Sequence, residues 1–122
     1  MRFTTLLPVL LGVLMLVFGL NKYLHFLEDF SLRPTAQAFW DGLKGTGYFF
    51  EWLGAVEMLC GLLLLFPRTR LVGATVLLPI AVNIIVFHLF LAPEAIVFGL
   101  AVFLLDLQVL WANRAAFRPL VA

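Results

Sequence analysis

Residues 71–91 read LVGATVLLPIAVNIIVFHLFL, and this stretch decides how the rest of the chain is interpreted. It is long and apolar enough to cross a lipid bilayer as a helix, which takes about 20 residues. It nevertheless contains Pro79, Asn83 and His88. Polar side chains at hydrocarbon depth cost free energy unless they find partners, so they face the interior of a helix bundle or a cavity. The sequence therefore predicts a buried polar site inside a membrane.

The composition of the whole chain is that of a membrane protein. Of 122 residues, 64% are hydrophobic and 12% are charged, and the mean hydropathy is +1.10. Soluble domains are near half apolar and a quarter charged. We expect an all-α polytopic membrane protein, a single domain over residues 1–122, with four transmembrane helices in a bundle. The spans are predicted at about 6–26, 49–66, 71–91 and 95–111.

The loop between the first two spans contains an amphipathic pattern. Its apolar positions recur at i, i+3, i+4 and i+7, which predicts a short helix over about 34–44: Ala36, Phe39, Trp40 and Leu43. Such a helix lies in the membrane interface with its aromatic side chains against the bundle or lipid. We interpret Phe39 and Trp40 as candidate lid residues.

Charge and cysteine content exclude several classes of function. The net charge is +1 with no basic block, so we expect no nucleic-acid partner. Cys60 is the one cysteine, which excludes an intramolecular disulfide and a dithiol relay. His25 and His88 resemble no ligand motif, so we predict no metal site and no intrinsic cofactor.

The distribution of basic residues gives an orientation. Five arginines flank one side of the predicted spans, namely Arg2, Arg68, Arg70, Arg114 and Arg118. The other side has Lys22, Arg33 and Lys44, mixed with acidic residues that include Glu28 and Asp29. By the positive-inside rule, both termini are expected to be cytoplasmic.

Polar residues of three spans are predicted to meet. At about 1.5 Å per residue, Lys22 lies roughly 6 Å below the outer boundary, and Glu57 and Asn83 lie roughly 12 Å below it. Helical side chains lean toward the N-terminus of their helix, so Lys22 and Glu57 lean toward each other. We predict an ion pair between them inside the bundle, with Asn83 as a hydrogen-bonding neighbour.

Simpler interpretations exist for each of these residues. Lys22 can extend to the lipid head groups, Glu57 can join helices as a neutral carboxyl, and Asn83 can support a kink at Pro79. Asp106 is expected to be structural and to meet an arginine such as Arg70 or Arg114, and a proton relay is the alternative.

Other positions also carry expectations. Phe87 and Phe90 are candidates for lining a pocket beside Asn83. Gly12 and Gly19 can pack within the bundle or against a second copy of the chain, so a homo-oligomer stays open.

Four sequence motifs together resemble the DoxX family. They are Phe18-Gly19-Leu20-Asn21-Lys22, then Gly45-Thr46-Gly47-Tyr48, Glu57 followed by Gly61-Leu62-Leu63-Leu64-Leu65, and Pro79 through Asn83 to Phe87-His88-Leu89-Phe90-Leu91-Ala92-Pro93. Members are small four-helix proteins of the bacterial inner membrane. At the matched positions the resemblance implies Lys22, Glu57, Asn83 and His88 as functional candidates.

The resemblance implies the membrane component of a redox system. On this hypothesis the chain binds a quinone or another small lipid-soluble ligand and works with a redox partner subunit, which supplies the electrons. The alternative is a non-enzymatic assembly or scaffolding protein in which the polar residues are structural. Transport is a third possibility, which needs an oligomer because four short helices leave little room for alternating access.

Overall fold

The computed structural model describes residues 3–26 and 32–121, which form helices and turns without any strand. The prediction of an all-α chain is confirmed. Arg2, Glu28 and Asp29, which entered the charge count, lie outside the described residues. In chain order the elements are α1 (Phe3–Leu24), α2 (Pro34–Gly45), α3 (Phe49–Leu65), α4 (Arg70–Leu91), η1 (Pro93–Ala95), α5 (Ile96–Ala112), η2 (Arg114–Phe117) and α6 (Arg118–Val121).

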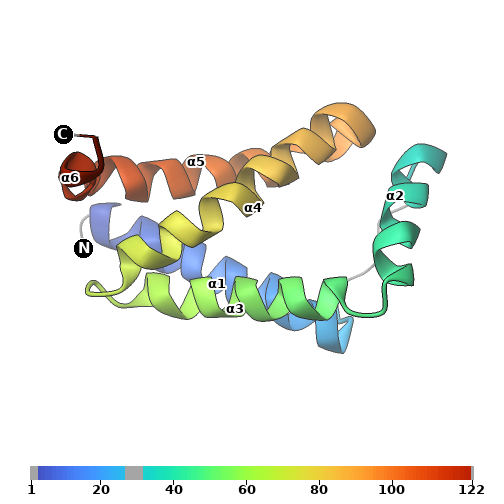
Figure 1. Cartoon of the computed structure of the whole chain (residues 1–122), viewed down its shortest axis with the longest axis horizontal. Coiled ribbons are helices and arrows are strands. Elements are labelled where there is room, and N and C mark those ends of the chain that lie inside the picture. The colour runs from blue at the N-terminus through green and yellow to red at the C-terminus, as the bar shows by residue number, and fades with distance from the viewer. Residues whose placement is uncertain (1–2, 27–31, 122) are drawn as a thin grey trace.

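The long helices pack in two layers. Helices α1 and α3 lie side by side in one layer, and α4 and α5 form the other (Figure 1). Both ends of the chain and the α3–α4 turn lie at one end of the molecule, called here the terminal end. Helix α2 crosses the opposite end, called the α2 end, and makes an angle of 89° with α3.

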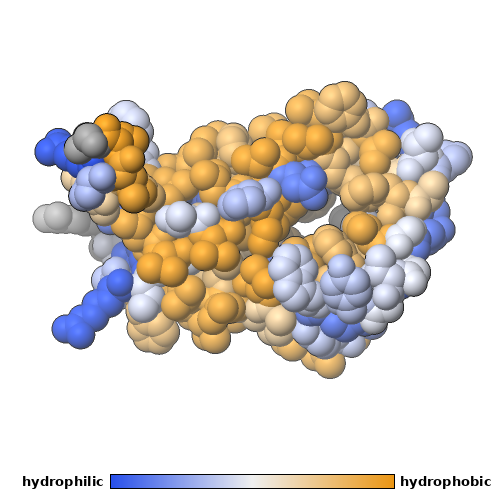
Figure 2. All heavy atoms as spheres, in the orientation of Figure 1, coloured by the Kyte–Doolittle hydropathy of each residue, from blue (hydrophilic) through white to orange (hydrophobic). Residues whose placement is uncertain are grey.

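Three helical segments in the described part of the chain are long and apolar enough to cross a membrane, or four if the bent pair α2 and α3 counts as one span. Many large apolar side chains point outward from them, among them Leu59, Val97 and Leu104. Figure 2 shows this apolar surface along the length of the molecule, with hydrophilic residues gathered mainly at its two ends. An exposed apolar surface of this extent suits helices that face lipid.

Helices α1 and α3 approach each other at paired glycines. A Cβ atom added to Gly12 would lie 2.8 Å from the Gly61 carbonyl oxygen, and one added to Gly19 would lie 2.6 Å from that of Gly54. Small residues at such positions let helix backbones come close together. Gly12 and Gly19 therefore pack within the chain, which is one of the two possibilities that the sequence left open.

Helix α4 is fixed at both ends by two further glycines. Near the terminal end, a Cβ on Gly73 would lie 2.9 Å from the Cys60 carbonyl oxygen of α3. Near the α2 end, Gly99 of α5 lies against the His88 ring, 3.0 Å from an added Cβ to Nδ1. Helix α4 thus follows α3 at one end and α5 at the other, and the two layers separate toward α2 (Figure 1).

The glycine contacts give a stability prediction with a matched control. We expect Gly19→Leu to lower the free energy of unfolding by about 2 kcal/mol, because the new side chain meets the α3 backbone and overpacking costs about 1–3 kcal/mol. Gly42→Leu should leave it nearly unchanged, since an added Cβ on exposed Gly42 has nothing within 4 Å. Unfolding in mild detergent measures both variants, and equal stabilities would contradict the packing described.

Candidate functional site

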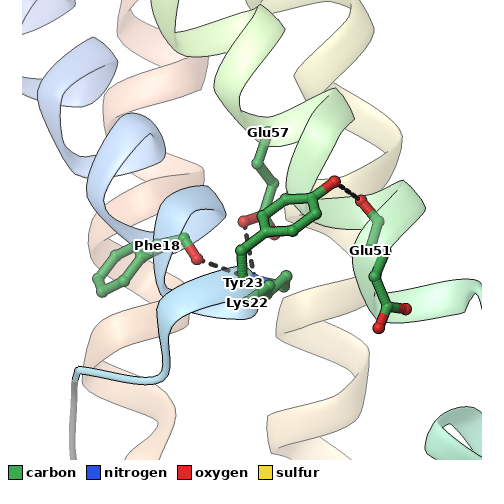
Figure 3. Close-up of polar contacts among 5 residues, drawn as sticks. All are labelled: Phe18, Lys22, Tyr23, Glu51 and Glu57. Carbon is green, nitrogen blue, oxygen red and sulfur yellow. Dashed lines mark hydrogen bonds and ion pairs between the residues drawn. The ribbon is translucent and has the colours of Figure 1, made fainter.

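Lys22 of α1 and Glu57 of α3 form an ion pair within the helical core. Lys22 Nζ donates to Glu57 Oε2 at 2.8 Å and lies 3.4 Å from the Phe18 carbonyl oxygen (Figure 3). Side-chain exposure is 17% for Lys22 and 5% for Glu57. The predicted ion pair is confirmed, and the alternative in which Lys22 extends to the head groups is wrong.

The glycine pairs explain how these two side chains meet. Gly19 and Gly54 each lie three residues before their charged neighbour, so each shares a helix face with Lys22 or Glu57. A Cβ on Gly54 would lie 3.1 Å from Lys22 Cβ, which shows how closely α3 passes the lysine. A charge at this depth costs about 3 kcal/mol of insertion free energy, and pairing offsets part of that cost.

A cavity of about 250 Å³ adjoins the lysine side of this pair at the α2 end. Helix α2 contributes one wall, and the end of α1 and the start of α3 contribute the others. Glu57 does not line it, so Lys22 connects the cavity to the buried carboxylate. The lining residues are Asn21, Lys22, His25, Trp40, Leu43, Lys44, Phe50 and Glu51.

Aromatic contacts hold α2 over the cavity. The Trp40 ring lies 4.6 Å from that of Phe50 on α3 and 6.3 Å from that of Phe87 on α4. Phe39 adds a second contact with Phe87 at 5.5 Å. The amphipathic loop helix therefore packs as its apolar pattern predicts, and Trp40, one of the two candidate lid residues, lines the cavity directly.

Polar contacts fix the two ends of α2. Arg33, just before the helix, forms an exposed ion pair with Glu94 at 3.4 Å. Beyond its C-terminus, Thr46 Oγ1 accepts a hydrogen bond from the Phe49 backbone N–H at 3.1 Å. Gly47 has φ of +79°, which an L side chain rarely adopts, and it makes the sharp turn into α3.

The end of α1 places a histidine at the cavity. His25 has φ of +52°, and its backbone N–H donates to the Asn21 carbonyl oxygen at 2.7 Å. This is the left-handed ending that closes many helices. The neighbouring Tyr23 hydroxyl donates to the Glu51 carbonyl oxygen, joining α1 to the start of α3 (Figure 3).

Most of the cavity wall was missed by sequence reasoning. Asn21, Leu43, Lys44, Phe50 and Glu51 line it without having been singled out as ligand candidates. The available signal was position, because each lies within about two turns of the boundaries of the first loop. Residues on the two sides of the long loop between α1 and α3 come together around α2, the helix that this loop contains.

Of the ligand-binding candidates from the sequence, Lys22 lines this cavity, and five do not, namely Glu57, Asn83, Phe87, His88 and Phe90. Asn83 is exposed, and the expectation that it neighbours the ion pair is wrong. The core face of α4 passes through Ala81, and two residues further on a helix turns by about 200° to the opposite side. His88 Nδ1 donates to the Ile84 carbonyl oxygen at 2.8 Å and faces α5, and Phe90 is 79% exposed.

Asp106 also differs from its predicted setting. Its side chain is fully buried, and neither carboxylate oxygen has a hydrogen-bond partner among residues 3–26 and 32–121. The expected arginines bind elsewhere. Arg70 Nε donates to the Leu64 carbonyl oxygen at 3.2 Å, and Arg114 Nη1 donates to that of Trp111 at 2.9 Å. Asp106 lies on the core-facing side of α5, away from the helix ends that the arginines cap.

A second hollow lies at the terminal end, between α4 and α5. It is an open groove of about 670 Å³ whose walls are mainly apolar and include Leu78, Leu104 and Trp111. In the described ranges no cluster of three His, Cys, Asp or Glu side chains is placed to hold a metal ion. Arg114 also lines this groove, and the cavity at the α2 end differs from it in adjoining the buried Lys22–Glu57 ion pair.

The chain matches no protein-family model, no curated protein and no solved structure. Its resemblance to the DoxX family stays an expectation from the quoted motifs.

The ion pair yields a prediction that distinguishes the cost of burying an unpaired charge from the attraction between the two charges. Glu57→Leu should lower the free energy of unfolding by about 3 kcal/mol, because it leaves the Lys22 ammonium without its partner in an apolar setting. The double variant Lys22→Leu/Glu57→Leu should regain most of that stability. Unfolding in detergent measures the series.

The exposed pair Arg33–Glu94 is the matched control for this series. Its side chains are 61% and 48% exposed, so Glu94→Leu should cost no more than about 1 kcal/mol. We infer that the unpaired Lys22 ammonium causes the loss of stability in Glu57→Leu. A double variant Lys22→Leu/Glu57→Leu that is no more stable than Glu57→Leu would contradict this inference.

Proposed function

We propose that this protein is a four-helix protein of the bacterial inner membrane that binds a quinone, or another small lipid-soluble molecule, in the cavity beneath α2. The observation that carries the proposal is the position of Lys22. Lys22 lines the cavity, and its ammonium is held by a buried carboxylate. A cation fixed in this way is a ready partner for a ligand oxygen at the edge of the membrane.

The cavity walls suit a ring with polar oxygens. Trp40 and Phe50 offer aromatic surface, and Lys22 and His25 offer groups that can donate hydrogen bonds. The volume of about 250 Å³ lies just below the range for sites that enclose drug-sized ligands. It fits a ring-sized head group whose apolar chain extends outside, along the lipid-facing helices.

The redox role requires a second protein. The sequence has one cysteine and therefore no dithiol to carry electrons. Electrons would come from a partner subunit or from a cofactor bound there, and this chain would hold and orient the ligand. It is then an accessory membrane component of an oxidoreductase.

The orientation proposed for the chain places the cavity on the outer side of the membrane. The described arginines at the terminal end, Arg68, Arg70, Arg114 and Arg118, would face the cytoplasm with both termini. The ligand would then exchange at the outer leaflet.

A scaffolding function is the second candidate, and Asn83 favours it. This amide is exposed on α4, within a segment apolar enough to cross a membrane. A polar side chain there gains from a hydrogen bond to another membrane helix. The exposed face of α4 around Asn83 would then bind a partner protein, and the Lys22–Glu57 pair would serve stability alone.

Ligand binding is tested by filling the cavity without touching the ion pair. Leu43→Trp should abolish binding of ubiquinone and menaquinone analogues, measured by native mass spectrometry in mild detergent, because the larger side chain occupies the cavity. The control Leu89→Trp makes the same change on an exposed face and should bind as the unmodified protein does. Equal quinone binding by both variants would overturn the proposal.

The scaffolding candidate makes a different prediction. Asn83→Leu should remove association with other membrane proteins, or with a second copy, without changing quinone binding or thermal stability, because Asn83 makes no contact with the cavity. Chemical cross-linking in intact membranes measures this association. Unchanged cross-linking would remove the observation that favours scaffolding.

A further inference from the structure

The carboxyl group of Asp106 is fully enclosed in the helical core. Its exposure is 0%, and both of its oxygens lie in the interior without a hydrogen-bond donor in the described part of the chain. It lies between Val102 and Val109 on the buried face of α5. An ionised carboxylate in such a place is strongly disfavoured, and a neutral, protonated carboxyl is the state that needs no charged partner.

Within the described ranges, the helices packed around α5 supply no positive charge to Asp106. The core-facing side chains of α1 are Leu11 and Met15, with Lys22 toward the α2 end and bound to Glu57. Those of α4 are Ala74, Leu77 and Ala81. The charged or titratable groups of α4 lie at its ends, where Arg70 binds a carbonyl oxygen and His88 faces Gly99.

Helix α3 does bring titratable groups near Asp106. Cys60 is fully buried and belongs to the same core cluster as Val102 and Val109, the buried residues of α5 on either side of Asp106. At about 1.5 Å per residue, Cys60 lies roughly 16 Å along α3 from Phe49, and Asp106 roughly 15 Å along α5 from Ile96, so each lies about two-thirds of the way along its helix. Glu57 lies one turn nearer the cavity than Cys60.

We propose that Asp106 is a proton-binding site inside the membrane, which holds a proton in the resting protein and exchanges it through the polar groups that lead to the cavity under α2. The route runs from the Asp106 carboxyl past the Cys60 thiol to the Glu57 carboxylate, which contacts Lys22 at the cavity wall. When the proton moves from Asp106 to Glu57, the first carboxyl becomes negative and the second neutral. The net charge of the helical core is unchanged by the transfer.

This site does not depend on which molecule occupies the cavity. A protonated Asp106 carboxyl in the interior can exchange a proton with the ion pair, so the charge near Lys22 can change without any movement of the helices. Any ligand that gains or loses a proton at Lys22 would have a proton donor or acceptor in the protein interior.

The protonation state can be measured directly by infrared spectroscopy of the full chain in lipid at neutral pH. A protonated carboxyl has a C=O stretching band that an ionised one lacks. We expect this band in the unmodified protein, and a shift to lower frequency when aspartate is labelled with ¹³C. The sequence has three aspartates, Asp29, Asp41 and Asp106. Variants Asp29→Asn and Asp41→Asn should keep the band, and Asp106→Asn should lose it.

The labelling experiment uses the unmodified chain, so it is decisive even where Asp106→Asn fails to fold. Absence of the band, or a band that ¹³C-aspartate does not shift, overturns the proposal. A band that appears only after sodium is removed also overturns it, because the site would then hold a metal cation in place of a proton.

The route is tested by deuterium exchange of the same band. In D₂O the band of the unmodified protein should shift as the proton exchanges, and Glu57→Gln should slow that shift because the amide cannot carry the proton onward. Glu94→Gln, an identical change on an exposed residue of η1 outside the cavity lining, should exchange as fast as the unmodified protein. Equal rates in all three proteins would overturn the route through Glu57.

Discussion

The close approach of α1 and α3 is the constraint on which the rest of the structure depends. Gly12, Gly19, Gly54 and Gly61 bring the two backbones within van der Waals contact. Only at that separation does the Lys22 ammonium reach the Glu57 carboxylate inside an apolar core. The ion pair in turn fixes which side of α1 faces inward, and so sets the end of α1 where the cavity forms.

The cavity follows from what happens where this contact ends. Helix α4 is fixed to α3 by Gly73 at the terminal end and to α5 by Gly99 at the other, so the layers separate toward α2. Helix α2 packs over that end through the contact between its Trp40 ring and the Phe87 ring of α4, and a space remains beside Lys22. The Lys22–Glu57 ion pair therefore adjoins a cavity at the end of the core that the aromatic side chains of α2 cover.

Sequence reasoning predicted the helices and the ion pair well, because both follow from local rules. Apolar runs and the period of 3.6 residues predict the helices, and side-chain lean and depth bring Lys22 to Glu57. The rotation of each helix about its own axis was beyond those rules. It is fixed by which small residues meet across an interface, so Asn83 turned out exposed and Asp106 lacked its arginine. A span that is apolar all round gives no pattern from which to read its buried face.

Mapping the binding site with a photoreactive quinone analogue tests the central claim most directly, because it reports where a ligand lies in the intact protein in its membrane. We expect adducts on residues at the end of α1, on α2 and at the start of α3, such as His25, Trp40 and Phe50. Adducts confined to the open groove near Leu104 and Trp111, or spread evenly over the lipid-facing helices, would contradict it.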